Sequence, residues 1–197
     1  IDLRRNGGGS PEAVQYIISH FLPADRPLVT FHMNGEPGPE TLATLAELPA
    51  GRMVGKPLYI LTSNGTASAA EEFTGHVAGY RIGEIVGETT AGAGFRNEFF
   101  PVAGQFLISI SVGRALLAST GKDWEGVGIA PTIAVSPAKA LESAQIHALR
   151  KLAAAKPEQK RQLEAQAALL AAQVEPVKTA LELPSYAGSY GERTLSL

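Results

Sequence analysis

The residues best suited to chemistry surround Ser68, in the stretch LTSNGTASAAEE over residues 61–72. An apolar run precedes this stretch and a helical pattern follows it, so the spacing predicts Ser68 in the first turn after a strand-to-helix connection. Backbone N–H groups are unpaired in such a turn, and the helix dipole favours negative charge there. Attack of the Ser68 hydroxyl on a carbonyl would develop an oxyanion, to which the Ala69 N–H is placed to donate. The pattern therefore indicates an acyl-transfer nucleophile.

A second donor to the oxyanion has to come from another segment. The best source is the turn Gly7-Gly8-Gly9, because residues without side chains can bring a backbone amide close to a ligand. A purely structural role for Ser68 is the alternative, since Ser68 and Glu71 have the spacing of a capping box. On the residues alone the cap is the commoner of the two roles. No G-x-S-x-G elbow is present, so an α/β-hydrolase is not indicated.

Two strand–turn–helix units are predicted to position these segments. The first is the end of a buried strand at residues 1–3, followed by the glycine turn and a helix that begins at Pro11 with Ser10 as its N-cap. The second is the apolar run at 58–61, followed by a helix over 66–79 and a further strand over 82–86. Such units imply a right-handed, largely parallel α/β core.

The other segments of the core are less regular. Residues 32–56 are rich in Gly and Pro and predict a surface excursion with one short helix over 40–47. Alternating apolar residues predict a hairpin over 99–112, turned near Gly104, and a short strand follows at 133–135.

Three parts are expected along the chain: an α/β core over 1–135, a helical extension over 136–183 and a β-like tail over 184–197. In the extension, two helices each carry an apolar face that we expect to pack on the core. The leucines of these faces are Leu141, Leu149 and Leu152 on the first helix, and Leu163 and Leu170 on the second.

Composition excludes several classes of function. The chain has 17 basic and 19 acidic residues, a net charge of −2, so nucleic acid is not an expected partner. There is no Cys, which rules out disulfides and thiolate metal sites, and no paired His spacing indicates a metal. We expect no cofactor and no integral membrane segment. A homo-oligomer is left open.

Four blocks of sequence together resemble peptidase family S41, the tail-specific or C-terminal processing peptidases. The blocks are IDLRRNGGG at 1–9, TASAAE at 66–71, GETTAG at 87–92 and GVGIAP at 126–131. The resemblance implies a crotonase-like spiral α/β core, a polypeptide substrate and a periplasmic or extracellular location. It also implies that Ser68 is the nucleophile, with the amides of Gly8 and Ala69 as oxyanion donors.

One position departs from the processing peptidases. Their general base is a lysine in the sequence Phe-Gly-Lys-Gly, where this chain has Ala93. The chain is thus more similar to the branch of tricorn core peptidases and interphotoreceptor retinoid-binding modules, whose peptidases take a histidine from an earlier segment. That resemblance implies that Glu125 orients the charge network. We expect a fragment that lacks its base and has little activity alone.

Two other functions compete with a serine peptidase. The first is a non-catalytic module that binds an apolar ligand, as in the retinoid-binding branch. The second is a crotonase-like acyl-CoA enzyme, which the four sequence blocks disfavour. One further departure is Thr132, which stands where the family usually has Asp after Ala-Pro.

Overall fold

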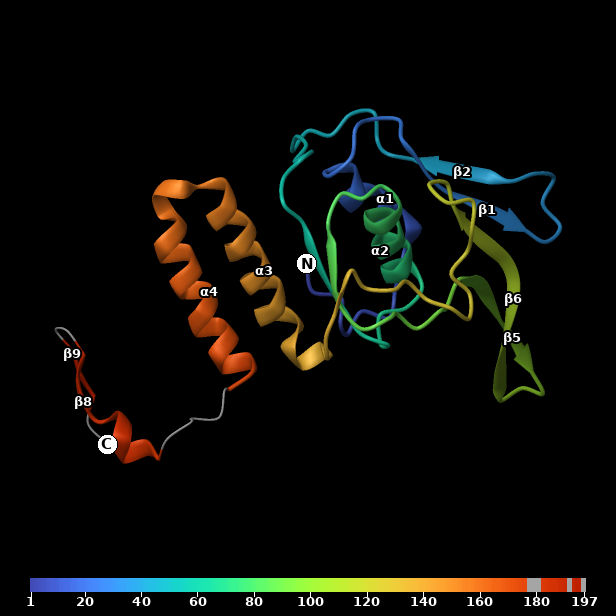
Figure 1. Ribbon diagram of the computed structural model, residues 1–197. Coiled ribbons are helices and arrows are strands. Elements are labelled where there is room, and N and C mark those ends of the chain that lie inside the picture. Colours follow the sequence, from blue (N-terminus) through green and yellow to red (C-terminus); the bar gives the residue numbers. More distant parts are fainter. Residues whose placement is uncertain (177–181, 191–192, 196–197) are drawn as a thin grey trace. The chain divides into compact units, whose positions relative to one another are not determined.

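The computed structural model describes residues 1–176, 182–190 and 193–195 (Figure 1). The chain divides into two compact units, Ile1–Ala144 and Gln145–Leu197. Each unit contains helices and strands. The first unit contains every segment of the candidate site.

A three-stranded parallel sheet forms one part of the first unit. It consists of β3 (Tyr59–Thr62), β4 (Glu84–Gly87) and β7 (Ile133–Ala134) in the order β3-β4-β7. The first residues of the chain lie beside β3, because Asp2 forms a parallel bridge with Leu61. The predicted parallel arrangement is confirmed, but residues 1–3 form only this single bridge and not a strand.

A larger antiparallel sheet forms the second part. Its order is β2-β1-β6-β5, with β1 at Pro27–Met33, β2 at Glu40–Ala43, β5 at Phe95–Val102 and β6 at Phe106–Leu117. The hairpin predicted around Gly104 is confirmed, although it begins earlier and ends later than the alternation indicated. The prediction of a largely parallel core overestimated the parallel part, because four of the seven strands in these two sheets are antiparallel.

The short helix predicted over 40–47 is wrong. Residues 40–43 instead form strand β2, which pairs antiparallel with β1. The Thr41 and Thr30 hydroxyls are 2.9 Å apart across this pair, and Leu42 packs against the hydrophobic core. A four-residue segment has weak preferences of its own, so the partner strand decides its conformation.

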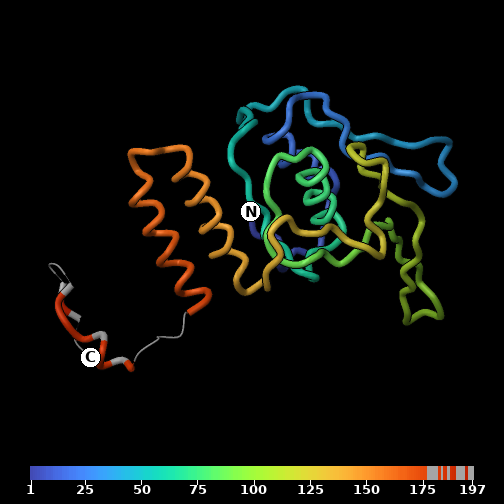
Figure 2. The backbone as a smooth tube through the Cα atoms, viewed as in Figure 1, coloured from blue at the N-terminus to red at the C-terminus, as the bar shows by residue number. Residues whose placement is uncertain are grey.

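Two helices cover the sheets. Helix α1 (Pro11–Ser19) is capped as predicted, with Ser10 Oγ accepting a hydrogen bond from Ala13 N–H at 3.2 Å. Helix α2 (Ala69–Gly79) contacts both β4 and β6, and its residues 69–77 are all buried. The backbone trace shows α2 enclosed by the rest of the first unit (Figure 2). The site that begins at Ser68 is therefore built on the most enclosed helix of the fold.

The outer half of the β5–β6 hairpin carries large apolar side chains that are exposed. Phe99, Phe106 and Leu107 are 68%, 69% and 70% exposed. The hairpin extends away from the other strands in Figure 1. Residues 95–97, at the start of β5, line the candidate site.

Helices follow the α/β segments, as predicted. After the 3-10 turn η1 (Pro137–Lys139), α3 spans Ala140–Ala155 and α4 spans Lys160–Val174, joined by the 3-10 turn η2 (Pro157–Gln159). The expected burial of all the leucines is wrong, since Leu141 and Leu152 are 44% and 41% exposed. Small side chains are buried in their place: Ala140 and Ala144 pack against Leu61 and Val86. Alanine allows a helix backbone to approach its neighbour more closely than leucine does.

The last segment contains a 3-10 turn, η3 (Leu183–Tyr186), and a two-stranded hairpin of β8 (Gly188–Tyr190) and β9 (Arg193–Leu195). The parts of the predicted extension and tail at 177–181, 191–192 and 196–197 lie outside the described residues. Among the helices that are described, none is both long and apolar enough to cross a membrane.

Candidate functional site

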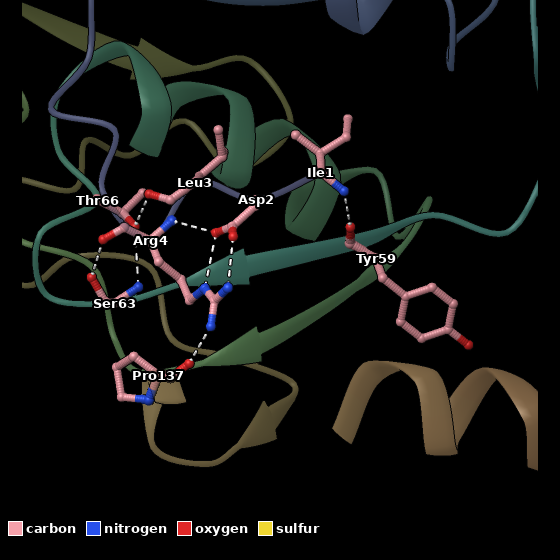
Figure 3. A network of polar contacts seen from close by, with 8 residues as sticks. All are labelled: Ile1, Asp2, Leu3, Arg4, Tyr59, Ser63, Thr66 and Pro137. Atoms are coloured by element: carbon pink, nitrogen blue, oxygen red, sulfur yellow. Dashed lines mark hydrogen bonds and ion pairs between the residues drawn. The ribbon is translucent and has the colours of Figure 1, made fainter. Parts of the chain in front are cut away.

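The connection from β3 to α2 is fastened to the start of the chain. The Thr66 hydroxyl donates to the Leu3 carbonyl at 2.8 Å, and the Ser63 hydroxyl donates to the Arg4 carbonyl at 2.6 Å (Figure 3). The Ala67 N–H donates to the Asn6 carbonyl at 3.1 Å. Two segments more than fifty residues apart in sequence are thus held together immediately before Ser68.

A surface ion pair supports the same segment. Arg4 donates to both carboxylate oxygens of Asp2, at 2.9 and 2.7 Å, and also to the Pro137 carbonyl at 2.6 Å (Figure 3). The hydrogen bond from the Arg4 guanidinium lowers the pKa of Asp2 from 3.8 to about 2, since it favours the charged carboxylate. The first block of the sequence therefore has a structural function besides supplying the glycine turn.

Ser68 is the N-cap residue of α2 and is half-buried. Its backbone has φ 53° and ψ −125°, which a residue with a side chain adopts only at a cost of about 1–3 kcal/mol. The surroundings form a capping box, in which Glu71 Oε2 accepts from Ser68 N–H at 2.9 Å and the Glu71 backbone N–H faces the Ser68 side chain, but the Ser68 hydroxyl makes no cap hydrogen bond. The Glu71 N–H donates to the Ser68 carbonyl at 2.8 Å. The hydroxyl is therefore not needed to cap the helix, which weakens the purely structural interpretation.

The glycine turn lies against Ser68. A Cβ on Gly8 would be 2.6 Å from Ser68 Cβ and 3.0 Å from Ala69 N, so only glycine fits at this place. The Gly8 N–H donates to Asn6 Oδ1 at 2.9 Å. Ala69 is the first residue of α2, and no hydrogen bond from its N–H reaches another described residue, as expected for a helix N-terminus. The structure brings Gly8, Ser68 and Ala69 together, as the sequence predicted.

Ser68 borders a hollow of about 320 Å³. Gly9 and Ala69 form one wall of its lining, and Ala93 and the start of β5 form another. The other lining residues include Glu72, Trp124 and Arg96. A smaller apolar hollow of about 120 Å³ lies on the other side of Ala69, lined by the glycine turn, by α1 and by Phe73. Ser68 lines only the larger hollow, whereas Ala69 lines both.

The loop after β4 contributes to this second wall and is held by two carboxylates. Glu71, which is 0% exposed, accepts hydrogen bonds from Gly92 N–H at 2.6 Å and Ala93 N–H at 2.7 Å. Glu125 is half-buried and accepts through Oε2 from Gly94 N–H at 2.7 Å and Phe95 N–H at 3.0 Å. Glu125 therefore lies at the back of this loop, while its neighbour Trp124 borders the hollow.

The histidines do not reach this hollow. His76 lies two turns along α2, is fully buried, and its Nε2 is 3.3 Å from Glu72 Oε1. His20 Nδ1 contacts the Tyr16 carbonyl at 3.0 Å at the end of α1. Within the described ranges, no histidine or lysine lines the hollow, and no group of three acidic or histidine side chains could hold a metal ion.

Sequence reasoning missed Glu72. This carboxylate is only 3% exposed, yet it lines the hollow beside Ser68 and Ala93. It lies one helical turn beyond Ser68, and residues four apart in a helix share a face. That spacing was the available signal, but it does not distinguish a buried glutamate from the usual exposed one.

Residues 1–135 match the family described as Peptidase family S41. The chain belongs to peptidase family S41. It is 28% identical over 135 residues to the carboxy-terminal processing protease CtpB of Bacillus subtilis (strain 168), a match that covers 68% of this chain and 27% of CtpB. Residues 1–135, which the family match covers, include the whole candidate site.

Solved structures agree with this assignment. The photosystem II D1 C-terminal processing protease superposes with a TM-score of 0.54 and 26% identity, covering 69% of this chain and 34% of that protein. Mature CPAF shares the fold, with a TM-score of 0.55, 16% identity and coverage of 92% and 45%. This chain spans about a quarter to a half of the length of these relatives.

Proposed function

We propose that this chain is the part of a serine endopeptidase that carries the nucleophile, and that it hydrolyses peptide bonds through an acyl-enzyme on Ser68. The observation that supports this most is the position of the Ser68 hydroxyl, on a strained turn beside a glycine turn and at the edge of a hollow, without a cap hydrogen bond. Strained backbone at a helix N-terminus next to a hollow is typical of a nucleophile.

The reaction follows from this geometry. Ser68 Oγ attacks the carbonyl carbon of the scissile bond, and the negative charge moves to the carbonyl oxygen. The Ala69 N–H donates to that oxygen, and so does an amide of the glycine turn, Gly8 as expected from the family resemblance. For this the Gly8 N–H has to exchange its hydrogen bond to Asn6 Oδ1 for one to the oxyanion. Collapse of the intermediate expels the amine with a proton and leaves an acyl ester on Ser68. Water then hydrolyses the ester and restores the hydroxyl.

A general base has to take the Ser68 proton, and Ala93 cannot do so. We assign this function to a histidine beyond residues 1–197, as in the tricorn-like branch, because the described lining of the hollow has neither histidine nor lysine. Glu125 is proposed to support that base from behind the 92–95 loop. A crotonase-like arrangement of the core and a periplasmic or extracellular location are part of the same proposal.

The non-catalytic binding module is the weaker alternative. The apolar hollow next to Ala69 is about 120 Å³, well below the ~300–1,000 Å³ of sites for drug-sized ligands. The hollow at Ser68, about 320 Å³, reaches only the lower end of that range, and its lining includes the charged residues Glu72 and Arg96. The size of the apolar hollow suits one small apolar side chain of a polypeptide instead. This favours a peptide substrate over a retinoid-like ligand.

Ser68→Ala in the full-length protein tests the proposal, with Ser10→Ala as a matched control. Both serines are helix N-caps, but only the Ser10 hydroxyl accepts a cap hydrogen bond. We expect a fluorophosphonate probe to label the wild type and Ser10→Ala, and casein cleavage to follow the labelling. Ser68→Ala should lose both activities.

The free energy of unfolding should respond more to Ser10→Ala than to Ser68→Ala. Loss of the Ser10 cap should lower the free energy of unfolding by about 1 kcal/mol, whereas Ser68→Ala should change it by less than that. An unlabelled wild type that is folded and binds retinol would favour the binding module.

A further inference from the structure

The Glu71 carboxylate is next to Ser68 and buried, and the reaction proposed above does not use it. All four lone-pair positions of a carboxylate are occupied here. Oε1 accepts from the Thr90 hydroxyl at 2.5 Å and from Gly92 N–H at 2.6 Å. Oε2 accepts from Ala93 N–H at 2.7 Å and from Ser68 N–H at 2.9 Å. The Glu71 carboxylate therefore fixes the positions of all four donor groups relative to one another.

These donors come from the two walls of the hollow. Ser68 belongs to the turn before α2, and Gly92 and Ala93 belong to the loop after β4. The φ of 53° at Ser68 persists only where its surroundings over-determine it. The hydrogen bond from Ser68 N–H to Glu71 is such a restraint. The same carboxylate also binds the amides of Gly92 and Ala93, so it sets the distance between the Ser68 turn and that loop.

Thr90 connects this carboxylate to a third segment. Its hydroxyl donates to Glu71 and accepts from Ile129 N–H at 2.7 Å. Its backbone N–H donates to the Ile129 carbonyl at 3.2 Å. Thr90 is 5% exposed, so these bonds are shielded from water. The segment that reaches Thr90 also carries Glu125, which holds the outer end of the 92–95 loop.

We propose that Glu71 and Thr90 are a positioning pair for the nucleophile, holding the Ser68 turn and the 90–95 loop at the separation that acyl transfer needs. This inference rests on the proposed peptidase function. Both side chains are buried, and neither borders the hollow, so neither touches the substrate. A misplacement of about 1 Å away from the reacting atoms can lower a rate about 10²-fold. Loss of the pair should accordingly lower kcat and leave KM unchanged.

Thr90→Val and Thr90→Ser in the full-length protein are the decisive variants. Valine has the shape of threonine but removes the donor to Glu71, while serine keeps the hydroxyl. We expect Thr90→Val to lower the rate of fluorophosphonate labelling and kcat at least about tenfold, because a hydrogen bond to a charged group is lost. Thr90→Ser should restore the wild-type rate. Glu71→Gln should lower the rate about 10²-fold.

Val77→Ala is the control for lost stability. Val77 is fully buried in the same helix, two turns beyond Glu71, and has no contact with the hollow. This variant should melt at a lower temperature but label at the wild-type rate wherever it is folded.

The outcomes separate the two proposals. Wild-type labelling by Thr90→Val would overturn the positioning pair and leave the peptidase function standing. The positioning pair would also be overturned if the labelling lost by Thr90→Val or Glu71→Gln only matched the unfolded fraction of the protein, as expected for Val77→Ala. Such a result would show a structural role alone. If the wild type itself is unlabelled, the proposed function fails and the positioning pair fails with it. Should Glu71→Gln not fold, the comparison of Thr90→Val with Thr90→Ser decides.

Discussion

Replacing Gly8 by alanine tests the contact between the glycine turn and Ser68, the proposed nucleophile. The new Cβ would lie 2.6 Å from Ser68 Cβ and 2.9 Å from the Ala67 carbonyl oxygen, closer than nonbonded carbon atoms approach. The φ of +107° at Gly8 is also unfavourable for a residue with a side chain. The two segments therefore have to move apart. The free-energy cost of the unfavourable backbone conformation adds to the cost of this displacement.

The magnitude follows from these two costs. A left-handed backbone costs an L-residue roughly 1–2 kcal/mol, and overpacking a close contact costs about 1–3 kcal/mol. The free energy of unfolding should thus fall by about 2–5 kcal/mol. Because the displaced atoms surround Ser68, labelling by a fluorophosphonate probe should fall about 10²-fold even where the variant is folded.

Urea unfolding followed by circular dichroism measures the first effect, and the rate of probe labelling in the full-length protein measures the second. Gly7→Ala is the matched control, since a Cβ on Gly7 would meet no atom within 4 Å and its φ is not positive. Its free energy of unfolding should change by no more than about 0.5 kcal/mol. A folded Gly8→Ala variant that labels at the wild-type rate would refute the view that this contact positions Ser68.

Two further predictions concern the loops and the first block of sequence. Gly128 and Gly126 have φ values of +69° and +68°, but a Cβ would collide with the Thr90 carbonyl only at Gly128. Gly128→Ala should therefore destabilise the protein by about 1–3 kcal/mol more than Gly126→Ala in urea unfolding, and equal losses would contradict the contact. Because Arg4 lowers the pKa of Asp2 to about 2, the ion pair stabilises the fold fully above pH 4 and loses this contribution as the pH falls through 2. With 52% of the Asp2 side chain exposed, the contribution is about 0.5–1 kcal/mol; unfolding at pH 5 and pH 2.5 should show it in the wild type, and Asp2→Asn should lack it.

Local signals in the sequence were sufficient where neighbouring residues decide the structure. Ser10 and Pro11 predicted the start of α1, because a cap hydrogen bond spans only three residues. The alternation on either side of Gly104 predicted the β5–β6 hairpin for the same reason. The blocks around Gly8, Ser68 and Glu125 could be singled out together by resemblance, although their separations in sequence reveal no contact.

Tertiary structure decided everything that depends on a distant partner. Residues 40–43 form a strand because β1 lies beside them, and Ala140 and Ala144, not Leu141, pack against Leu61 and Val86. The sequence by itself determined that Ser68 begins a helix and that residues 7–9 form a glycine turn, since both features are local. The contact between them was decided by the fold. Only the fold placed Glu71 in the interior, with Ser68 on one side and the Thr90 loop on the other. A glutamate in a first helical turn is ordinarily a solvent-exposed cap, and burial becomes favourable only when enough donors from other segments surround its charge.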